Sequence, residues 1–419
     1  MTIDLIRYRG LAEKIFADVR EFSFDGVGIT RESYGRGESA AADYLRDFAE
    51  SEGLTVQADR AANLIFRFPE TPVGDPVVWM GSHMDSVPQG GNYDGLAGVV
   101  AGLLCLVARR REGVGGPFEV IGLRGEESAW FGKAYVGSSA LLGILSEADL
   151  ALRRRGAEES LGDCMQGLGA DMTAIRAGER LFDLAHVKAY LELHIEQGPV
   201  MVARNLPVAV VSSIRGNFRH NHVVCEGEAG HSGVVPRWLR HDAMFAVADL
   251  LMRLDEHWRM LLERGTDLVL TAGIVGTDPA DHAVSRIPGR VAFSLEARSR
   301  STDTLEAFYQ LVRAECSAIA HERGVAFEFD RRVLSAPATM NVRVCDTLSA
   351  ACAALELAHD VIPSGAGHDA ALMANAGIPS GMVFVRNQNG SHNPREAMEL
   401  DDFMQGVQVL SNALEPLCA

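Results

Sequence analysis

The chain has 419 residues, 47% of them apolar and 23% charged, so it is long enough for two domains with substantial cores. Its formal net charge of −17 disfavours binding to the phosphate backbone of nucleic acids, because a net negative field repels it. No apolar run reaches the ~20 residues that a transmembrane helix requires, so we expect neither a nucleic-acid partner nor a membrane partner. The seven cysteines are scattered without a Cys-x-x-Cys pair, and the N-terminus mixes charged and apolar residues, which predicts a cytoplasmic protein.

The first half of the chain alternates between helical and extended patterns. The predicted elements are a helix over 39–52, strands over 54–57, 63–68 and 77–80, a nearly all-apolar helix over 95–111, and strands over 118–123 and 189–193. Residues 145–185 are mixed and polar, which indicates helical segments without defined limits. Strands that alternate with helices are typical of an α/β domain with a mostly parallel sheet.

The second half begins with a different pattern. Four segments predict strands and two predict helices, in the order β-α-β-β-α-β of a ferredoxin-like domain: 219–226, 238–262, 268–274, 290–295, 302–323 and 325–329. A helix over 346–357, a strand over 381–385 and a final helix from near Arg395 then restore the first pattern. We therefore predict an α/β fold with two domains. Residues 1–212 and 331–419 form a central, mostly parallel sheet flanked by helices, and residues 213–330 form an inserted ferredoxin-like α+β domain.

Polar clusters follow four of the predicted apolar strands. They are His83 with Asp94, Glu126 with Glu127, His194, and His392. Ligands collect outside the carboxyl ends of strands in open α/β sheets, so we expect these clusters to converge. Imidazole and carboxylate groups are ligands for divalent ions, and their number suits two ions ~3.5–4 Å apart. Asp85 lies two residues after His83 and is predicted to orient it by accepting its second ring N–H.

The adjacent residues Glu126 and Glu127 are predicted to have different roles. A water molecule activated by metal ions needs a nearby carboxylate as general base, and one carboxylate cannot easily both bind metal and carry the proton. We predict that Glu127 binds metal and that Glu126 is the base. A solvated turn is the alternative for an isolated Glu-Glu pair, but these two residues directly follow a buried strand.

Six motifs together resemble the M20 metallopeptidase superfamily, and within it the amidohydrolase branch of N-carbamoyl-L-amino-acid hydrolases, allantoate amidohydrolases and β-ureidopropionase-type enzymes. The motifs are Gly-Ser-His-Met-Asp-Ser at 81–86, Gly-Gly-Asn-Tyr-Asp-Gly at 90–95, Glu-Glu at 126–127, His-Ile-Glu-Gln-Gly-Pro at 194–199, Ala-Gly-His-Asp-Ala at 366–370 and Ser-His-Asn-Pro at 391–394. The resemblance implies a zinc-aminopeptidase-like fold. It places His83, Asp94 and His194 on one ion and Asp94, Glu127 and His392 on the other. Zinc is the expected metal, with manganese, cobalt or nickel as alternatives.

The resemblance also implies roles for residues outside the metal centre. The inserted domain is expected to act as a lid and as the interface of a homodimer. His231, within Gly230-His231-Ser232-Gly233, is expected to stabilise the oxyanion, and Arg298 to bind the substrate carboxylate. Gln197, Ser285 and His368 are the further residues that we expect to contact the substrate.

Two departures from the family pattern bear on the substrate. The segment Ser128-Ala129-Trp130 stands where the family usually has Gly-Ser-Arg, and Ser285 stands where an Asn is common. Trp130 offers an apolar surface in place of a cation, which favours a substrate less polar than allantoate.

The resemblance predicts an enzyme that hydrolyses a linear C–N bond, in a ureido (N-carbamoyl) group of a small amino-acid-like molecule. An N-acyl-amino-acid amidase or a dipeptidase of the same superfamily is the alternative. A non-catalytic binding protein would have no need of the ligands and the base together.

Overall fold

A computed structural model of the chain describes residues 3–72 and 74–418. The chain forms two compact units, Met1–Ser213 with Thr339–Ala419, and Ile214–Ala338. The second boundary lies later than the expected residue 330. The reason is that strand β14 (Val333–Ser335) pairs with β7 (Gly216–Glu226), so the chain leaves the second unit only after β14.

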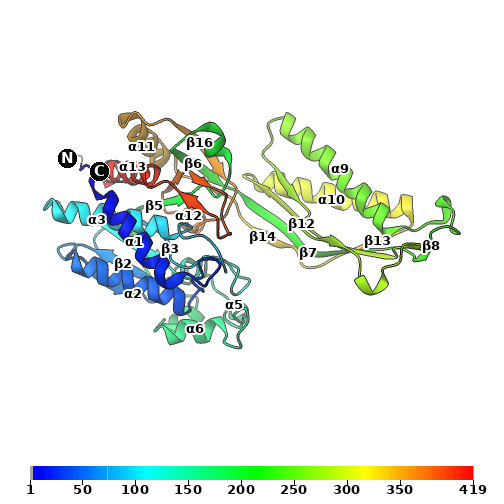
Figure 1. The fold of residues 1–419 in the computed structure, drawn as a ribbon, viewed down its shortest axis with the longest axis horizontal. Helices are drawn as coiled ribbons and strands as arrows, with labels where there is room; N and C mark the ends of the chain where they lie inside the picture. The colour runs from blue at the N-terminus through cyan, green and yellow to red at the C-terminus, as the bar shows by residue number, and fades with distance from the viewer. Residues whose placement is uncertain (1–2, 73, 419) are drawn as a thin grey trace. The chain divides into compact units, whose positions relative to one another are not determined.

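The first unit is built on a nine-stranded sheet in the order β1-β2-β4-β3-β5-β17-β6-β15, with β16 also beside β6 (Figure 1). The strands are β1 (Thr55–Ala58), β2 (Leu64–Arg67), β3 (Val77–His83), β4 (Phe118–Leu123), β5 (Val187–Ile195), β6 (Val208–Ile214), β15 (Ala338–Thr339), β16 (His359–Ser364) and β17 (Ser380–Val385). The neighbours β4, β3, β5 and β17 run parallel, whereas β2 and β6 pair antiparallel on either side of them. We expected a mostly parallel sheet, but the sheet is mixed and parallel only at its centre.

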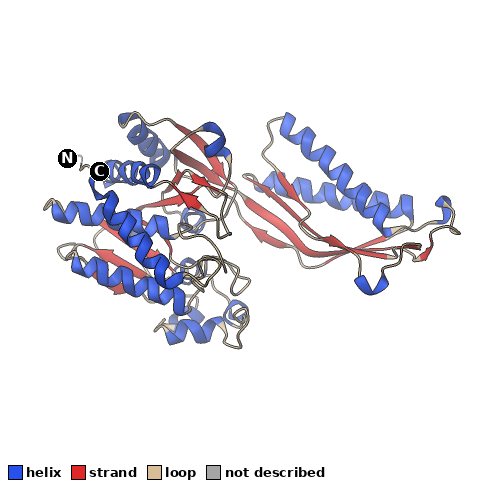
Figure 2. Cartoon of the chain, in the orientation of Figure 1, coloured by secondary structure: helices blue, strands red, loops and turns tan. Residues whose placement is uncertain are grey.

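Helices cover this sheet (Figure 2). They include α1 (Arg9–Ser23), α2 (Arg36–Ser51), α3 (Leu96–Arg111), α11 (Val342–Ala354), α12 (Asp369–Asn375) and α13 (Leu400–Cys418), with shorter helices α4 (Val136–Leu141), α5 (Glu147–Leu150), α6 (Leu161–Gly167), α7 (Met172–Arg176) and α8 (Val200–Arg204). α3 packs on β3, β4, β5 and α13, and it is buried on nearly every side. Its close approach needs Gly98, where a Cβ atom would lie 2.3 Å from the carbonyl oxygen of Leu193. None of the helices among the described residues has the length and apolar character to cross a membrane.

The second unit contains the predicted β-α-β-β-α-β series as β7, the helix α9 (Ala243–Glu263), β9 (Val269–Thr271), β12 (Arg290–Ser299), the helix α10 (Thr302–Arg323) and β13 (Ala326–Phe329), to which the short strands β10 (Val275–Gly276) and β14 are added. The sheet order is β10-β12-β7-β13, and both long helices lie on one face of it (Figure 1). The helix α9 starts at Ala243 and not at residue 238, because the Asp242 side chain caps it by accepting from the N–H groups of Met244 and Phe245.

Candidate metal centre

The central strands bring the predicted ligands to one edge of the first sheet. β3 ends at His83, β5 carries His194 near its end, and Glu126 and Glu127 follow β4. The loop after β17 carries His392. Because these four strands are parallel neighbours, their carboxyl ends lie at the same edge of the sheet.

Asp94 lies at the centre of this group of side chains. Its Oδ1 is 3.4 Å from Nε2 of His83 and 3.2 Å from Nε2 of His194. Its Oδ2 is 3.5 Å from Nε2 of His392, and the same nitrogen is 3.2 Å from Oε1 of Glu127. Two groups of possible metal ligands, His83-Asp94-His194 and Asp94-Glu127-His392, therefore share one carboxylate. A third group, Glu192-His194-His368, lies behind them and shares only His194.

The electrostatics of the two groups fit divalent cations. Burial opposes the charge of Asp94, but hydrogen bonds from His194, His392 and His83 hold its pKa well below its usual range. Hydrogen bonds to Asp94 and Glu127 raise the pKa of His392 to about 11. The carboxylates therefore create a negative potential that holds protons on the imidazoles, and a bound cation would replace those protons. Three imidazoles and two carboxylates are a donor set that suits zinc and the neighbouring divalent transition metals.

Asp85 connects His83 with the glutamate pair. Its Oδ1 is 3.2 Å from Nδ1 of His83 and accepts the N–H of Glu126 at 3.1 Å. Its Oδ2 accepts the N–H of Glu127 at 3.1 Å and the hydroxyl of Ser33 at 2.6 Å. One fully buried carboxylate thus sets both the ring orientation of His83 and the path of the backbone that carries Glu126 and Glu127.

Glu126 differs from Glu127 in its partners. Glu127 contacts His392, whereas Oε2 of Glu126 lies 3.9 Å from Nε2 of His83. Glu126 as a whole residue is only 9% exposed. Burial raises the pKa of Glu126 well above its usual range, and the neighbouring charges of Glu127 and Asp369 add to the effect. A carboxyl group with a raised pKa beside a cluster of ligands is suited to accept and return a proton.

Gln197 and His392 have left-handed backbones, with φ of 62° and 58°. Such conformations are costly for residues other than glycine and often accompany functional sites. Nε2 of Gln197 donates to Oδ2 of Asp94 at 2.6 Å, and its backbone N–H donates to Oδ1 of Asn387 at 2.9 Å. These contacts place Gln197 against the shared carboxylate.

His368 lies behind His194. Its ring is 1% exposed, and its centroid lies 4.5 Å from that of His194 in an edge-to-face arrangement. Nε2 of His368 is 2.9 Å from Oγ of Ser364. Burial and the proximity of His194 hold the pKa of His368 well below its usual range, so this ring stays neutral.

The other three predicted site residues belong to the second unit. Strand β8 (Gly230–His231) pairs with β11 (Arg286–Ile287), and the N–H of Ser232 donates to the carbonyl of Ser285 at 2.8 Å. His231 and Ser285 are therefore neighbours. Arg298, on β12, forms hydrogen bonds with the carboxylate of Glu296 at 3.0 and 3.1 Å.

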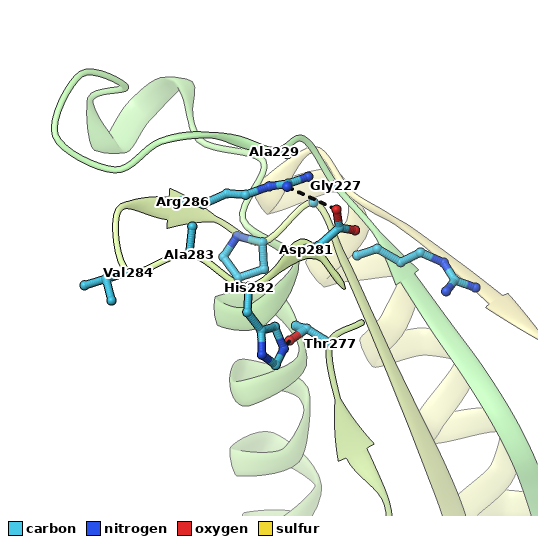
Figure 3. Close-up of a pocket in the computed structure, with 11 residues that line it drawn as sticks. Gly227, Ala229, Thr277, Asp281, His282, Ala283, Val284 and Arg286 are labelled. Atoms are coloured by element: carbon cyan, nitrogen blue, oxygen red, sulfur yellow. Dashed lines mark hydrogen bonds and ion pairs between the residues drawn. The ribbon is translucent and has the colours of Figure 1, made fainter. Parts of the chain in front are cut away.

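A cavity of about 540 Å³ lies next to the β8–β11 pair (Figure 3). The loop that borders it is braced by a contact of 2.6 Å between Oγ1 of Thr277 and Nε2 of His282, and by an ion pair of 3.0 Å between Arg286 and Asp281. Val284, at the end of this loop, is fully exposed. The loop therefore presents an apolar tip next to Ser285.

Several residues of the centre had no role in the sequence prediction. Oγ of Ser391 donates to Oδ2 of Asp94 and lies 2.6 Å from Oε2 of Glu396. Arg31 is fully buried, and its Nε donates to the carbonyl of Met84 at 2.8 Å. The position of Ser391 beside His392 was an available signal, whereas nothing around Arg31 in the sequence indicates a buried cation.

Trp130 is attached to the segment that carries His83 and Asp85. Its indole N–H donates to the carbonyl of Ser86 at 2.7 Å, and its ring is partly exposed. The indole is therefore fixed to the loop that follows His83 and Asp85, and it lies only a few residues after Glu126 and Glu127 in the sequence.

Residues 79–415 match the model of peptidase family M20/M25/M40. An N-carbamoyl-L-amino-acid amidohydrolase of Paenarthrobacter aurescens is 31% identical over 97% of this chain and 98% of its own length. An allantoate amidohydrolase of Escherichia coli K12 is 29% identical over 99% of both chains.

A solved amidase of the hydantoinase/carbamoylase family from Burkholderia multivorans superposes with a TM-score of 0.88 at 26% identity, and covers 100% of this chain and 99% of its own. These matches span nearly the whole chain, and they confirm the resemblance predicted from the motifs. The chain belongs to the M20 peptidase family and is a hydrolase of that family.

Proposed function

We propose that this chain is a dinuclear metal-dependent amidohydrolase that hydrolyses the linear C–N bond of an N-carbamoyl group on a small amino-acid-like substrate. The observation that carries the proposal is Asp94, whose two oxygens face two separate groups of ligands. Relatives that cover nearly the whole chain bear the names of N-carbamoyl-amino-acid and allantoate amidohydrolases, which both act on ureido compounds.

The residues of the centre have distinct roles in this reaction. His83, Asp94 and His194 would hold one divalent ion, and Asp94, Glu127 and His392 the other. When bound, the ions supply Lewis acidity that polarises the carbonyl group and promotes deprotonation of water. The carboxylate of Glu126 takes the proton from the attacking water and then delivers it to the leaving nitrogen. Asp85 keeps Glu126 in place through its backbone N–H.

We propose four polar residues as substrate contacts, namely Gln197, Arg298, His231 and Ser285. Oε1 of Gln197 is buried and has no hydrogen-bond partner among the residues that the structure describes, so it can accept an N–H of the ureido group. Arg298 offers a planar guanidinium for the substrate carboxylate. His231 donates to the oxygen that becomes negative in the transition state, and Ser285 forms part of the same substrate contact. His368 supports His194 from behind.

Trp130 favours a carbamoyl substrate with an apolar side chain. Its indole, attached to Ser86, places an apolar surface beside the centre, and allantoate carries polar ureido groups that such a surface does not complement. An N-acyl-amino-acid amidase or a dipeptidase remains the second candidate, because the same centre can cleave an ordinary amide bond.

We further propose a cytoplasmic homodimer that forms through the second unit, which also acts as the lid. The second unit exposes large apolar side chains on α9 and just before β10, including Phe245 at 61%, Met252 at 68% and Ile274 at 69%. Exposed apolar surface of this kind is typical of protein interfaces. A double substitution of Phe245→Glu and Met252→Glu is expected to yield a monomer in size-exclusion chromatography with light scattering.

A substrate panel tests the proposed reaction. The purified protein, loaded separately with zinc, manganese, cobalt or nickel, is offered N-carbamoyl, N-formyl and N-acetyl amino acids, dipeptides and allantoate. The highest kcat/KM is expected for an N-carbamoyl amino acid with an apolar side chain. A preference for N-acetyl amino acids or dipeptides would favour the second candidate. Absence of turnover on every compound, together with absence of tight metal binding, would contradict the proposal.

A further inference from the structure

The loop after β17 supplies more to the centre than His392. Glu396, four residues later, is 8% exposed, and its Oε1 accepts the N–H groups of Tyr93 at 2.9 Å and Asp94 at 3.2 Å. Its Oε2 lies 2.6 Å from the hydroxyl of Ser391, which donates in turn to Oδ2 of Asp94. Glu396 therefore binds the backbone of Asp94 directly and is linked to the Asp94 carboxylate through the hydroxyl of Ser391.

We propose that Ser391 and Glu396 are positioning residues that fix the orientation of the Asp94 carboxylate and thereby set the affinity of the protein for both metal ions. This inference rests on the dinuclear centre of the proposed function. Neither residue is one of the ligands, and both act through Asp94.

The orientation of Asp94 matters because its two oxygens serve different groups. Oδ1 faces His83 and His194, and Oδ2 faces His392. A rotation of the carboxylate about its Cβ–Cγ bond would turn both oxygens away from their ligand groups at once. The hydroxyl of Ser391 binds Oδ2 together with Nε2 of Gln197 and opposes that rotation. Glu396 holds the backbone from which the side chain extends. The carboxylate is thus held at both ends.

The chain is built to admit Glu396 at this position. A Cβ atom on Gly91 would lie 2.0 Å from the carboxyl carbon of Glu396, so no larger residue fits at 91 while Glu396 keeps its place. Burying a carboxyl group is costly unless hydrogen bonds compensate for its lost hydration. Here two backbone N–H groups donate to Oε1, and Oε2 has the hydroxyl group of Ser391 as its hydrogen-bond partner. All three groups belong to Asp94 or its immediate neighbours in space.

Metal titration of the apo protein tests the inference without any assay of turnover. Zinc affinity is measured by competition with a chromophoric chelator, and the melting temperature is recorded for each variant. Ser391→Ala and Glu396→Ala are expected to weaken zinc binding by about 10–100-fold, the usual effect of removing a group that orients a ligand. Ser391→Thr keeps a hydroxyl, and Glu396→Gln keeps an acceptor for the two N–H groups and a donor for Ser391. Both conservative variants are expected to stay within about threefold of the wild type.

Glu119→Ala is the matched control. Glu119 is a buried carboxylate of the same unit, 2% exposed, which accepts from the indole of Trp79 at 2.9 Å and lies away from the ligands. Its removal is expected to lower the melting temperature and leave zinc affinity unchanged within about twofold. If Glu396→Ala does not fold, the zinc affinity of Ser391→Ala tests the inference. This variant should fold, because it removes only one hydroxyl group from a partly exposed residue.

Wild-type affinity in Ser391→Ala would overturn the inference, as would a loss of affinity that merely follows the loss of stability seen with Glu119→Ala. A wild-type protein that binds no divalent ion would overturn the proposed function, and this inference with it. The two failures are therefore distinguishable from the same titration.

Discussion

Replacing Glu126 by Gln separates proton transfer from metal binding. The amide has nearly the same shape as the carboxylate but cannot accept a proton. The contact that Asp85 makes at this position is to the backbone N–H, which the substitution leaves in place. The ligand groups contain Glu127 and not Glu126, so both ions should remain bound.

The expected loss is that of a general base, about 10²–10⁴-fold in kcat, or about 3–5.5 kcal/mol at 1.36 kcal/mol per tenfold. Because burial already raises the pKa of Glu126 well above its usual range, a neutral side chain at this site should leave the apo protein at least as stable as the wild type.

The assay combines kcat on the best substrate of the panel, metal content by elemental analysis and melting temperature. Glu127→Gln serves as the control, since it should lose one of the two ions. Near-normal kcat in Glu126→Gln would refute the assignment of the base. Loss of metal in Glu126→Gln would show instead that Glu126 is a ligand.

Three further substitutions test other features. Gly95→Ala would place a Cβ atom 2.3 Å from the ring of His83, so elemental analysis should show that metal is lost. Gly113→Ala is the control, because Gly113 has a similar φ of +69° but open space around it. This control should cost only about 1–2 kcal/mol of stability and keep its metal. Trp130→Arg should raise kcat/KM for allantoate relative to that for an N-carbamoyl amino acid, whereas Trp130→Phe should leave this ratio nearly unchanged. Equal ratios in the wild type and both variants would show that Trp130 does not determine substrate specificity. Burial and the nearby charge of Glu192 raise the pKa of Asp369 from 3.8 to about 7. Between these two pH values the folded state binds more protons than the unfolded state. The stability that this group contributes is therefore present at low pH and is lost as the pH rises through 7. Chemical denaturation of Asp369→Asn should therefore show a gain relative to wild type of a few kcal/mol at most at pH 8, and a smaller gain at pH 5; a pH-independent difference would contradict the shift.

Much of the fold was visible in the sequence because its signals are local. The helix predicted over 302–323 is the observed α10, and the strand predicted over 118–123 is the observed β4. The ligand residues were also accessible, because they lie at the ends of buried apolar strands or in the loops that follow them. The M20 motifs then supplied the grouping of these residues into two sites.

The missing parts depend on contacts between distant segments. The late end of the second unit follows from the pairing of β14 with β7 across more than a hundred residues, which no local pattern reveals. Arg31 is paired with a backbone carbonyl, that of Met84, and a carbonyl leaves no trace in the sequence. Glu396 looked like an ordinary residue near the start of the final helix, but α13 starts only at Leu400 and Glu396 lies in the loop before it.

The contact between Asp94 and Glu396 joins positions 302 residues apart in the chain. A ribosome that adds about 5–20 residues per second would therefore need about 15–60 s after it has made Asp94 before it makes Glu396. During that interval the nascent chain holds His83 and Asp94 but lacks His392, Ser391 and Glu396. The complete centre can therefore acquire its ions only when synthesis is almost finished. A chain that ends after His194 but before residue 391 would have the whole first group of ligands but would lack His392 of the second.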